Sequence, residues 1–128
     1  MSEKESGTSR QKGAGMDSVG ISSAITDELV GGITGALGSV VTEIILYGSV
    51  ARGTAEHDSD VDIALLTRRP LSAEEEDRLS DVIVDLDLKY DKVFSVIDIA
   101  GAEFRTWLNV IPFYKNVANE GVVLWTAA

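Results

Sequence analysis

Cysteine is absent from the 128 residues, and the chain has only one histidine and two prolines. Without thiols the protein has no disulfide framework, no thiolate nucleophile and no cysteine zinc site. Its apolar runs stay well short of the roughly 20 residues that a membrane-spanning helix needs, and the polar residues 1–15 lack the apolar stretch of a signal peptide. We therefore expect a cytoplasmic protein that does not engage a membrane.

Basic residues are also scarce. Eleven Lys and Arg stand against 21 Asp and Glu, which gives a formal net charge of −10. Binding to a nucleic-acid backbone depends on clustered cationic side chains, so this balance argues against direct nucleic-acid binding. The remaining composition, 45% hydrophobic and 25% charged, is typical of a globular domain.

The chain divides into two parts by composition. Residues 1–15 are rich in Ser, Gly, Lys and Glu and hold almost no apolar side chain, so they cannot offset the entropy lost on ordering. They predict a flexible N-terminal tail. Residues 16–128 predict one folded domain.

Hydrophobic periodicity within that domain alternates between helical and strand spacing. Ile25, Leu29, Ile33 and Leu37 recur every four residues, which predicts a helix. A capping-box pair, Ser72 and Glu75, begins a second helix. The predicted elements are a helix over 21–37, strands over 40–47 and 60–66, a helix over 73–89, a strand over 92–99, a helix over 112–117 and a strand over 122–125. This order predicts an α/β (α+β) fold, with a short mixed β-sheet flanked by helices.

Chemically suggestive residues gather around the first two predicted strands. Gly48 and Ser49 follow a buried strand, where a close backbone approach and a hydroxyl would suit phosphate oxygens. Asp60 and Asp62 are two residues apart at the start of the next strand, so both carboxylates project from one face. Two like charges held this close favour a hard cation between them, and Mg²⁺ commonly bridges carboxylates and substrate phosphates.

Three segments carry a family resemblance: Gly48-Ser49, Arg52-Gly53 and Ser59-Asp60-Val61-Asp62. Together they resemble the signature of the DNA polymerase β nucleotidyltransferase superfamily, over about residues 40–125. The small size is most similar to the minimal nucleotidyltransferases (MNT), which are often encoded beside a HEPN-domain partner.

The resemblance implies a polymerase-β-like nucleotidyltransferase fold and an Mg²⁺-dependent transfer of a nucleoside monophosphate, AMP from ATP, to a hydroxyl. It implies nucleotide binding by Gly48, Ser49, Arg52 and Ser59. Two Mg²⁺ ions would be held by Asp60, Asp62 and a third carboxylate. The partner implied is a HEPN toxin, with this chain as the antitoxin that attaches AMP to it, for example on a tyrosine. Arg52 serves equally well as an ion-pair partner for Glu56 or Asp58.

The third carboxylate has several candidates. Asp91 lies at the start of the predicted third strand and is our choice as catalytic and metal-binding residue. Asp98 lies seven residues further on and therefore points to the opposite face. Ser95 shares a face with Asp91, so a register shift of four residues would put a serine where the acid is expected.

Two other functions fit the sequence. A non-catalytic antitoxin would neutralise its HEPN partner by binding alone, through an apolar patch around Phe104, Trp107 and Phe113. A small-molecule nucleotidyltransferase, similar to aminoglycoside-modifying enzymes, would use the acidic surface to attract polycationic substrates. The small size of the domain argues against the second, since those enzymes add a further domain to a similar core.

Overall fold

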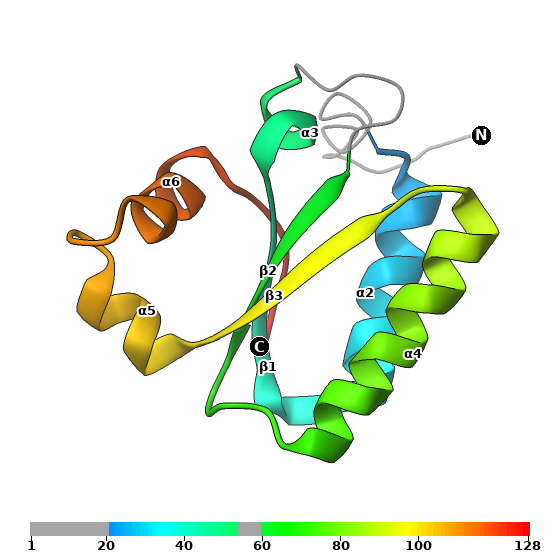
Figure 1. Cartoon of the computed structure of the whole chain (residues 1–128), viewed down its shortest axis with the longest axis horizontal. Helices are drawn as coiled ribbons and strands as arrows, with labels where there is room; N and C mark the ends of the chain where they lie inside the picture. The colour runs from blue at the N-terminus through cyan, green and yellow to red at the C-terminus, as the bar shows by residue number, and fades with distance from the viewer. Residues whose placement is uncertain (1–20, 54–59) are drawn as a thin grey trace.

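A four-stranded sheet in the order β3-β2-β1-β4 organises the computed structural model, which describes residues 21–53 and 60–128 (Figure 1). The elements in chain order are α2 (Ser23–Leu37), η1 (Gly38–Val40), β1 (Val41–Tyr47), α3 (Gly48–Arg52), β2 (Val61–Thr67), α4 (Ala73–Tyr90), β3 (Phe94–Ala100), α5 (Gly101–Trp107), α6 (Pro112–Glu120) and β4 (Val122–Thr126). The predicted tail over residues 1–15 lies outside the described residues.

The sheet is mixed, as predicted. β1 pairs antiparallel with β2 on one side and with β4 on the other, whereas β2 and β3 run parallel and are joined through α4. β3 and β4 are therefore the two edge strands. The mixed sheet with flanking helices confirms the predicted fold class.

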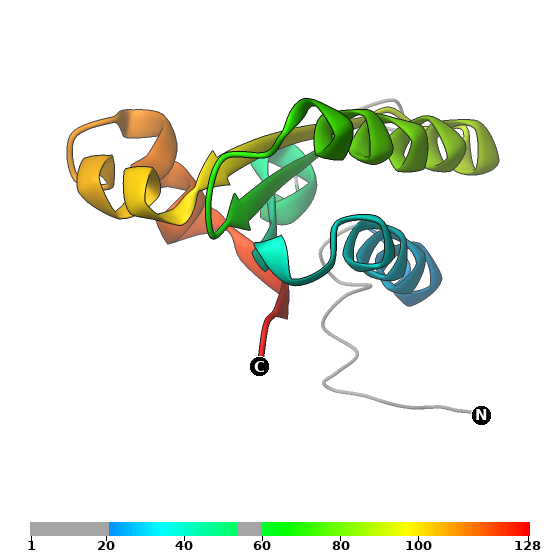
Figure 2. The same ribbon diagram turned by 90° about the horizontal axis from the view of Figure 1, so that it is seen from below.

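One face of the sheet, the α2/α4 face, carries the larger core. Leu29 and Ile33 of α2 are fully buried, which confirms the helical spacing in the sequence. They pack in one cluster with Ile44 and Ile63 of the central strands and with Leu86 of α4. Figure 2 shows α2 and α4 side by side along this face. Burying each of these aliphatic side chains stabilises the fold by about 1.5–3 kcal/mol.

The opposite face, the α5/α6 face, carries a smaller core. Ala64 and Ile99 from the strands pack with Phe104 of α5 and Val117 of α6. The sequence analysis did not predict α5, which follows β3 without a loop. The two short helices lie together at one end of the molecule, away from α2 and α4 (Figure 1).

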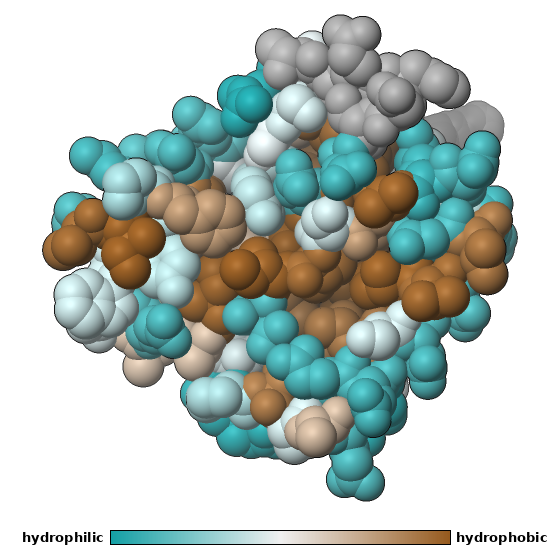
Figure 3. Space-filling view, in the orientation of Figure 1, coloured by the Kyte–Doolittle hydropathy of each residue, from teal (hydrophilic) through white to brown (hydrophobic). Residues whose placement is uncertain are grey.

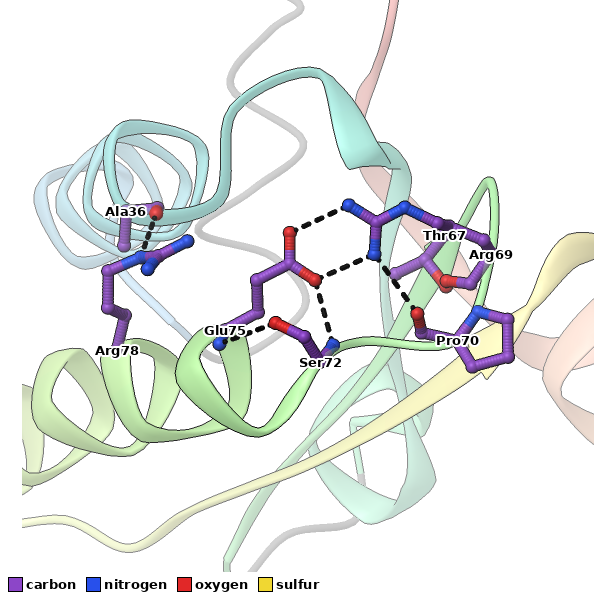
Figure 4. A network of polar contacts seen from close by, with 7 residues as sticks. All are labelled: Ala36, Thr67, Arg69, Pro70, Ser72, Glu75 and Arg78. Carbon is purple, nitrogen blue, oxygen red and sulfur yellow. Dashed lines mark hydrogen bonds and ion pairs between the residues drawn. The ribbon is translucent and has the colours of Figure 1, made fainter.

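The start of α4 is fixed by a polar network (Figure 4). The Ser72 side chain accepts from the Glu75 amide at 3.2 Å, and the Glu75 carboxylate accepts from the Ser72 amide at 2.8 Å, which confirms the predicted capping box. Both guanidinium ends of Arg69 donate to Glu75, at 2.8 and 2.9 Å. These bonds, with the Arg69 contribution largest, lower the pKa of Glu75 to about 2. Arg78 then ties α4 to α2 by donating to the Ala36 carbonyl oxygen at 2.9 Å.

Candidate functional site

The two aspartates predicted as metal ligands lie at the start of β2. Asp60 directly precedes the strand and is exposed, and Asp62 is its second residue and half-buried. Because side chains alternate along a strand, Asp62 shares a face with Ala64, which belongs to the α5/α6 core. The acid pair therefore lies on the α5/α6 face, at the end of the sheet where α3 begins.

Gly48 brings the end of β1 into direct contact with this pair. Its φ is 78°, a left-handed conformation that side chains disfavour. A Cβ on Gly48 would lie 3.2 Å from Asp62 Cγ and closer still to Asp62 Oδ2. Only glycine leaves room for the Asp62 carboxylate in this position. The glycine–serine turn and the acid pair, separate in the sequence, thus form one site.

A row of three side chains crosses the sheet at this level. Tyr47 of β1 is the register partner of Asp62, and Asp62 is the register partner of Ser95 on β3. The Ser95 hydroxyl donates to Asp60 Oδ2 at 3.4 Å, a long hydrogen bond. The position beside Asp62 on the neighbouring parallel strand is therefore occupied by a serine.

The charges of the site influence one another. Burial and the nearby Asp60 carboxylate raise the pKa of Asp62, and the Arg52 charge lowers it by a smaller amount. Burial and the Asp62 charge likewise raise the pKa of Tyr47. Negative charge is thus concentrated here beyond what Arg52 balances, and a bound cation would relieve it.

Arg52 has a partner that the sequence analysis did not consider. Its guanidinium lies 3.3 Å from Glu120, and both side chains are about half exposed. This ion pair joins the end of α3 to the end of α6. The alternative partners Glu56 and Asp58 lie outside the described residues, as does Ser59.

Asp91, our choice for the third carboxylate, lies between α4 and β3 and not at the start of the strand. α4 continues to Tyr90 and β3 begins only at Phe94, so Asp91 is the C-cap of α4 with a φ of 52°. No three acidic or histidine side chains in residues 21–53 and 60–128 form a group that could hold a metal ion. A ligand role for Asp91 stays a prediction, and the structure brings it into no cluster with Asp60 and Asp62.

Asp98 faces away from the acid pair, as expected from its position. It lines a groove on the α2/α4 face, where its carboxylate raises the pKa of Glu76, with burial as the larger cause. Asp98 therefore does not complete the site either.

Tyr47 is the site residue that the sequence analysis missed. Its ring packs edge-on against Phe113 of α6, with the ring centroids 5.4 Å apart. Strand parity could have found it, because Tyr47 follows Ile45 by two residues and directly precedes Gly48. Tyr47 therefore lies beside Asp62 in the sheet and contacts α6 through Phe113.

Comparison with known proteins identifies the family of this chain. The family model for a nucleotidyltransferase domain matches residues 32–118, which include β1, α3, β2 and the acid pair. The chain belongs to this nucleotidyltransferase family. Two Methanocaldococcus jannaschii proteins, both named as candidate protein adenylyltransferases, are similar in sequence. One is 34% identical over 66% of this chain and 79% of its own length, and the other is 35% identical over 42% and 54%.

Solved structures share the nucleotidyltransferase fold. A chain from a toxin–antitoxin structure with AMP-PNP matches with a TM-score of 0.57 and 20% identity, over 80% of this chain and 73% of that one. A chain from the Shewanella oneidensis complex of a tri-AMPylated HEPN toxin with an MNT antitoxin matches with a TM-score of 0.54 and 17% identity, over 81% and 71%. At these identities the likeness concerns the fold.

Within residues 21–53 and 60–128 of the nucleotidyltransferase, no helix is both long and apolar enough to cross a bilayer.

Proposed function

We propose that this nucleotidyltransferase transfers AMP from ATP to a hydroxyl group of a protein acceptor, in the cytoplasm. The acceptor oxygen forms a bond to the α-phosphorus, the bond to the bridging oxygen breaks, and pyrophosphate leaves. The hydroxyl proton passes to a carboxylate, for which the exposed Asp60 is well placed. The names of the two archaeal relatives, which specify protein adenylyltransferases, support the acceptor class.

The observation that carries this proposal is the contact between Gly48 and Asp62. A backbone that can approach phosphates lies directly against a carboxylate that can hold a metal, and a side chain at position 48 would separate the two. Gly48, Ser49, Arg52 and Ser59 are proposed to bind the nucleotide.

The donor set suits Mg²⁺. Mg²⁺ is usually bound by one or two carboxylates together with substrate phosphates, and Asp60 and Asp62 supply two carboxylates whose mutual repulsion a cation would relieve. When bound, two such ions would neutralise charge on the triphosphate and on the attacking oxygen. The chain itself contributes the spacing of the two carboxylates, the Ser95 hydroxyl bonded to Asp60, and the half-buried setting of Asp62.

We further propose that the partner is a HEPN toxin and that this chain is its antitoxin. The fold is shared with chains from toxin–antitoxin structures, one of them of an AMPylated HEPN toxin with an MNT antitoxin. Residues 16–128 would form the catalytic domain.

Label transfer from α-³²P-ATP tests the proposal. Purified protein is incubated with MgCl₂ or EDTA and with the product of the adjacent gene. We expect Mg²⁺-dependent label on that protein, lost in Asp62→Asn and retained in Asp81→Asn, which changes an exposed acid on the distant surface of α4. Equal label in both variants would refute the role of Asp62. Absence of label, with inhibition of the partner unaffected by Asp62→Asn, would instead establish an antitoxin that acts by binding alone.

A further inference from the structure

The outer edge of β3 is open for pairing. β3 is an edge strand, and no other described strand pairs with its outer side. The Val61 amide donates to the Val93 carbonyl oxygen at 2.8 Å, so the backbone groups of Val93 and Ser95 point inward to β2. Those of Phe94 and Val96 therefore point outward. The Phe94 amide already donates to Asp87 at 2.8 Å. The outward backbone groups further along β3, from Val96 onward, are the ones that an added strand could bind.

The side chains along this edge are unusually apolar for an exposed strand. Val93 is 54% exposed and Ile97 is 42% exposed, both on the same face of the sheet as Ser95. Figure 3, which has the orientation of Figure 1 with β3 in front, shows an apolar band that crosses the middle of the molecule over β3 and continues over α4. Exposed edges of this kind are normally protected by charges or a covering segment, so this one indicates a binding surface.

A groove continues the edge on the other face of the sheet. It lies between α4 and β3 and has a volume of about 240 Å³. Its lining residues are Glu76, Leu79, Ser80, Ile83, Val84, Phe94, Val96 and Asp98. A strand added beside β3 would direct alternate side chains into this groove.

Negative charge marks one end of the groove. The Glu76 and Asp98 carboxyl groups are close neighbours there, and the chain as a whole carries a net charge of −10. A basic side chain on the added strand would be attracted to this end, while its neighbours contact Val84 and Val96. The groove thus favours a basic rather than an acidic segment.

On the opposite face the same added strand would approach the acid pair. Asp62 on β2, Ser95 on β3 and the facing residue of the added strand would lie in one row across the sheet. Neighbouring strands are about 4.8 Å apart, so the added strand would lie two such spacings from Asp62. Ser95 is small and leaves space above β3, so a long side chain that ends in a hydroxyl can extend across it toward Asp60 and Asp62. Val93 and Ile97 would contact apolar side chains on either side of that residue.

We propose that the protein acceptor binds as a fifth strand along the outer edge of β3, with a long hydroxyl side chain over Ser95 and basic side chains toward Glu76 and Asp98. The inference rests on the proposed function for its acceptor class. Strand addition to an exposed sheet edge gives affinity through main-chain hydrogen bonds and specificity through alternate side chains.

Two synthetic peptides of identical composition test this binding mode. In TVKYKVT the tyrosine shares a face with the valines and the lysines point to the other face, as the proposal requires. In TKVYVKT the lysines and valines exchange faces while the tyrosine stays in place. On addition of TVKYKVT, we expect the NMR chemical shifts of the β3 backbone amides to change. TKVYVKT should bind at least about tenfold more weakly than TVKYKVT and should receive AMP more slowly.

Matched variants of the protein separate the two sheet edges. Ile97, Ala64, Ile45 and Val123 form one register row across all four strands, and Ile97 and Val123 are 42% and 47% exposed on the opposite edge strands. We expect Ile97→Lys to weaken binding of TVKYKVT at least about tenfold and Val123→Lys to leave it unchanged. Circular dichroism and thermal melts verify that both variants fold.

The readouts distinguish this inference from the proposed function. Binding at β3 that is sensitive to Ile97→Lys, without AMP transfer, supports the docking surface and counts against the activity. AMP transfer at the same rate to TVKYKVT and TKVYVKT, unchanged by Ile97→Lys, supports the activity and overturns the docking surface. Equal binding of both peptides, or of neither, also overturns it. Sedimentation velocity tests whether a second copy of this chain binds the edge instead. A dimer that Ile97→Lys dissociates would show that β3 pairs with a second copy, and would overturn the proposal.

Discussion

Replacing Gly48 by alanine should damage the nucleotide site as well as lower the stability of the fold, and a matched variant can separate the two effects. The left-handed φ of 78° costs an alanine about 1–2 kcal/mol. The new methyl group would also lie 3.2 Å from Asp62 Cγ and 3.3 Å from Asp62 Cβ, with the carboxylate oxygen nearer still. The Asp62 carboxylate must therefore rotate away from its position.

Gly53 provides the matched control. Its φ is 76°, nearly the same as that of Gly48, yet a Cβ there would have no atom within 4 Å. Gly53→Ala therefore carries the conformational cost alone. Gly53→Ala should lose about 1–2 kcal/mol of unfolding free energy, seen as a thermal midpoint lowered by several degrees, and Gly48→Ala should lose at least as much.

The two variants should differ in function. A displacement of about 1 Å at a reacting centre can lower the rate about a hundredfold, so Gly48→Ala should lose AMP transfer by that order while Gly53→Ala keeps it. Calorimetry with ATP and Mg²⁺ provides an independent readout, with weaker binding expected only in Gly48→Ala. If Gly48→Ala bound ATP and transferred AMP as Gly53→Ala does, the contact between Gly48 and Asp62 would have no functional role, and the reasoning would be refuted.

Three further changes test other parts of the structure. Ser95→Asp, which places a third carboxylate beside Asp62, should lower the thermal midpoint in EDTA and raise it on addition of Mg²⁺ more than in the wild type; an equal response would contradict the register. Asp91→Asn keeps a residue that tolerates the left-handed turn and, from the position of Asp91 before β3, should leave Mg²⁺–ATP binding unchanged in calorimetry; a clear loss would support the predicted ligand role of Asp91. The lowered pKa of Glu75 adds stability above its unfolded value of 4.5 that is lost as the pH falls toward about 2, so Glu75→Gln should flatten the pH dependence of urea unfolding in that range; a parallel curve would refute this.

The sequence predicted the elements well where periodicity is strong. The predicted helix over 73–89 is observed over Ala73–Tyr90, and the predicted strand over 40–47 over Val41–Tyr47. α5 was missed because it has only seven residues and follows β3 directly: its turn residue, Gly101, is already the first residue of the helix, and no side chain caps it. Such short helices depend on the sheet they pack against rather than on their own propensity.

The site was predictable in part. Strand parity placed Asp60 and Asp62 on one face, and residue type identified Gly48. The third position was not predictable, because it depends on how β3 registers against β2 after α4 crosses the sheet. β3 begins at Phe94, and its register places Ser95, four residues after Asp91, beside Asp62. Register of this kind is set by tertiary packing.

The order of the strands also has a consequence for biosynthesis. Among the strands of residues 21–53 and 60–128, β4 comes last and pairs with β1, which comes first, so one side of β1 stays unpaired until Thr126 has left the ribosome. Ile44 and Leu46 of β1 are completely buried in the finished fold. A nascent or truncated chain that lacks β4 would present the edge of this apolar strand to other chains. Proteolysis or premature termination before β4 should therefore produce an aggregating product, and a chaperone would find its binding site on β1.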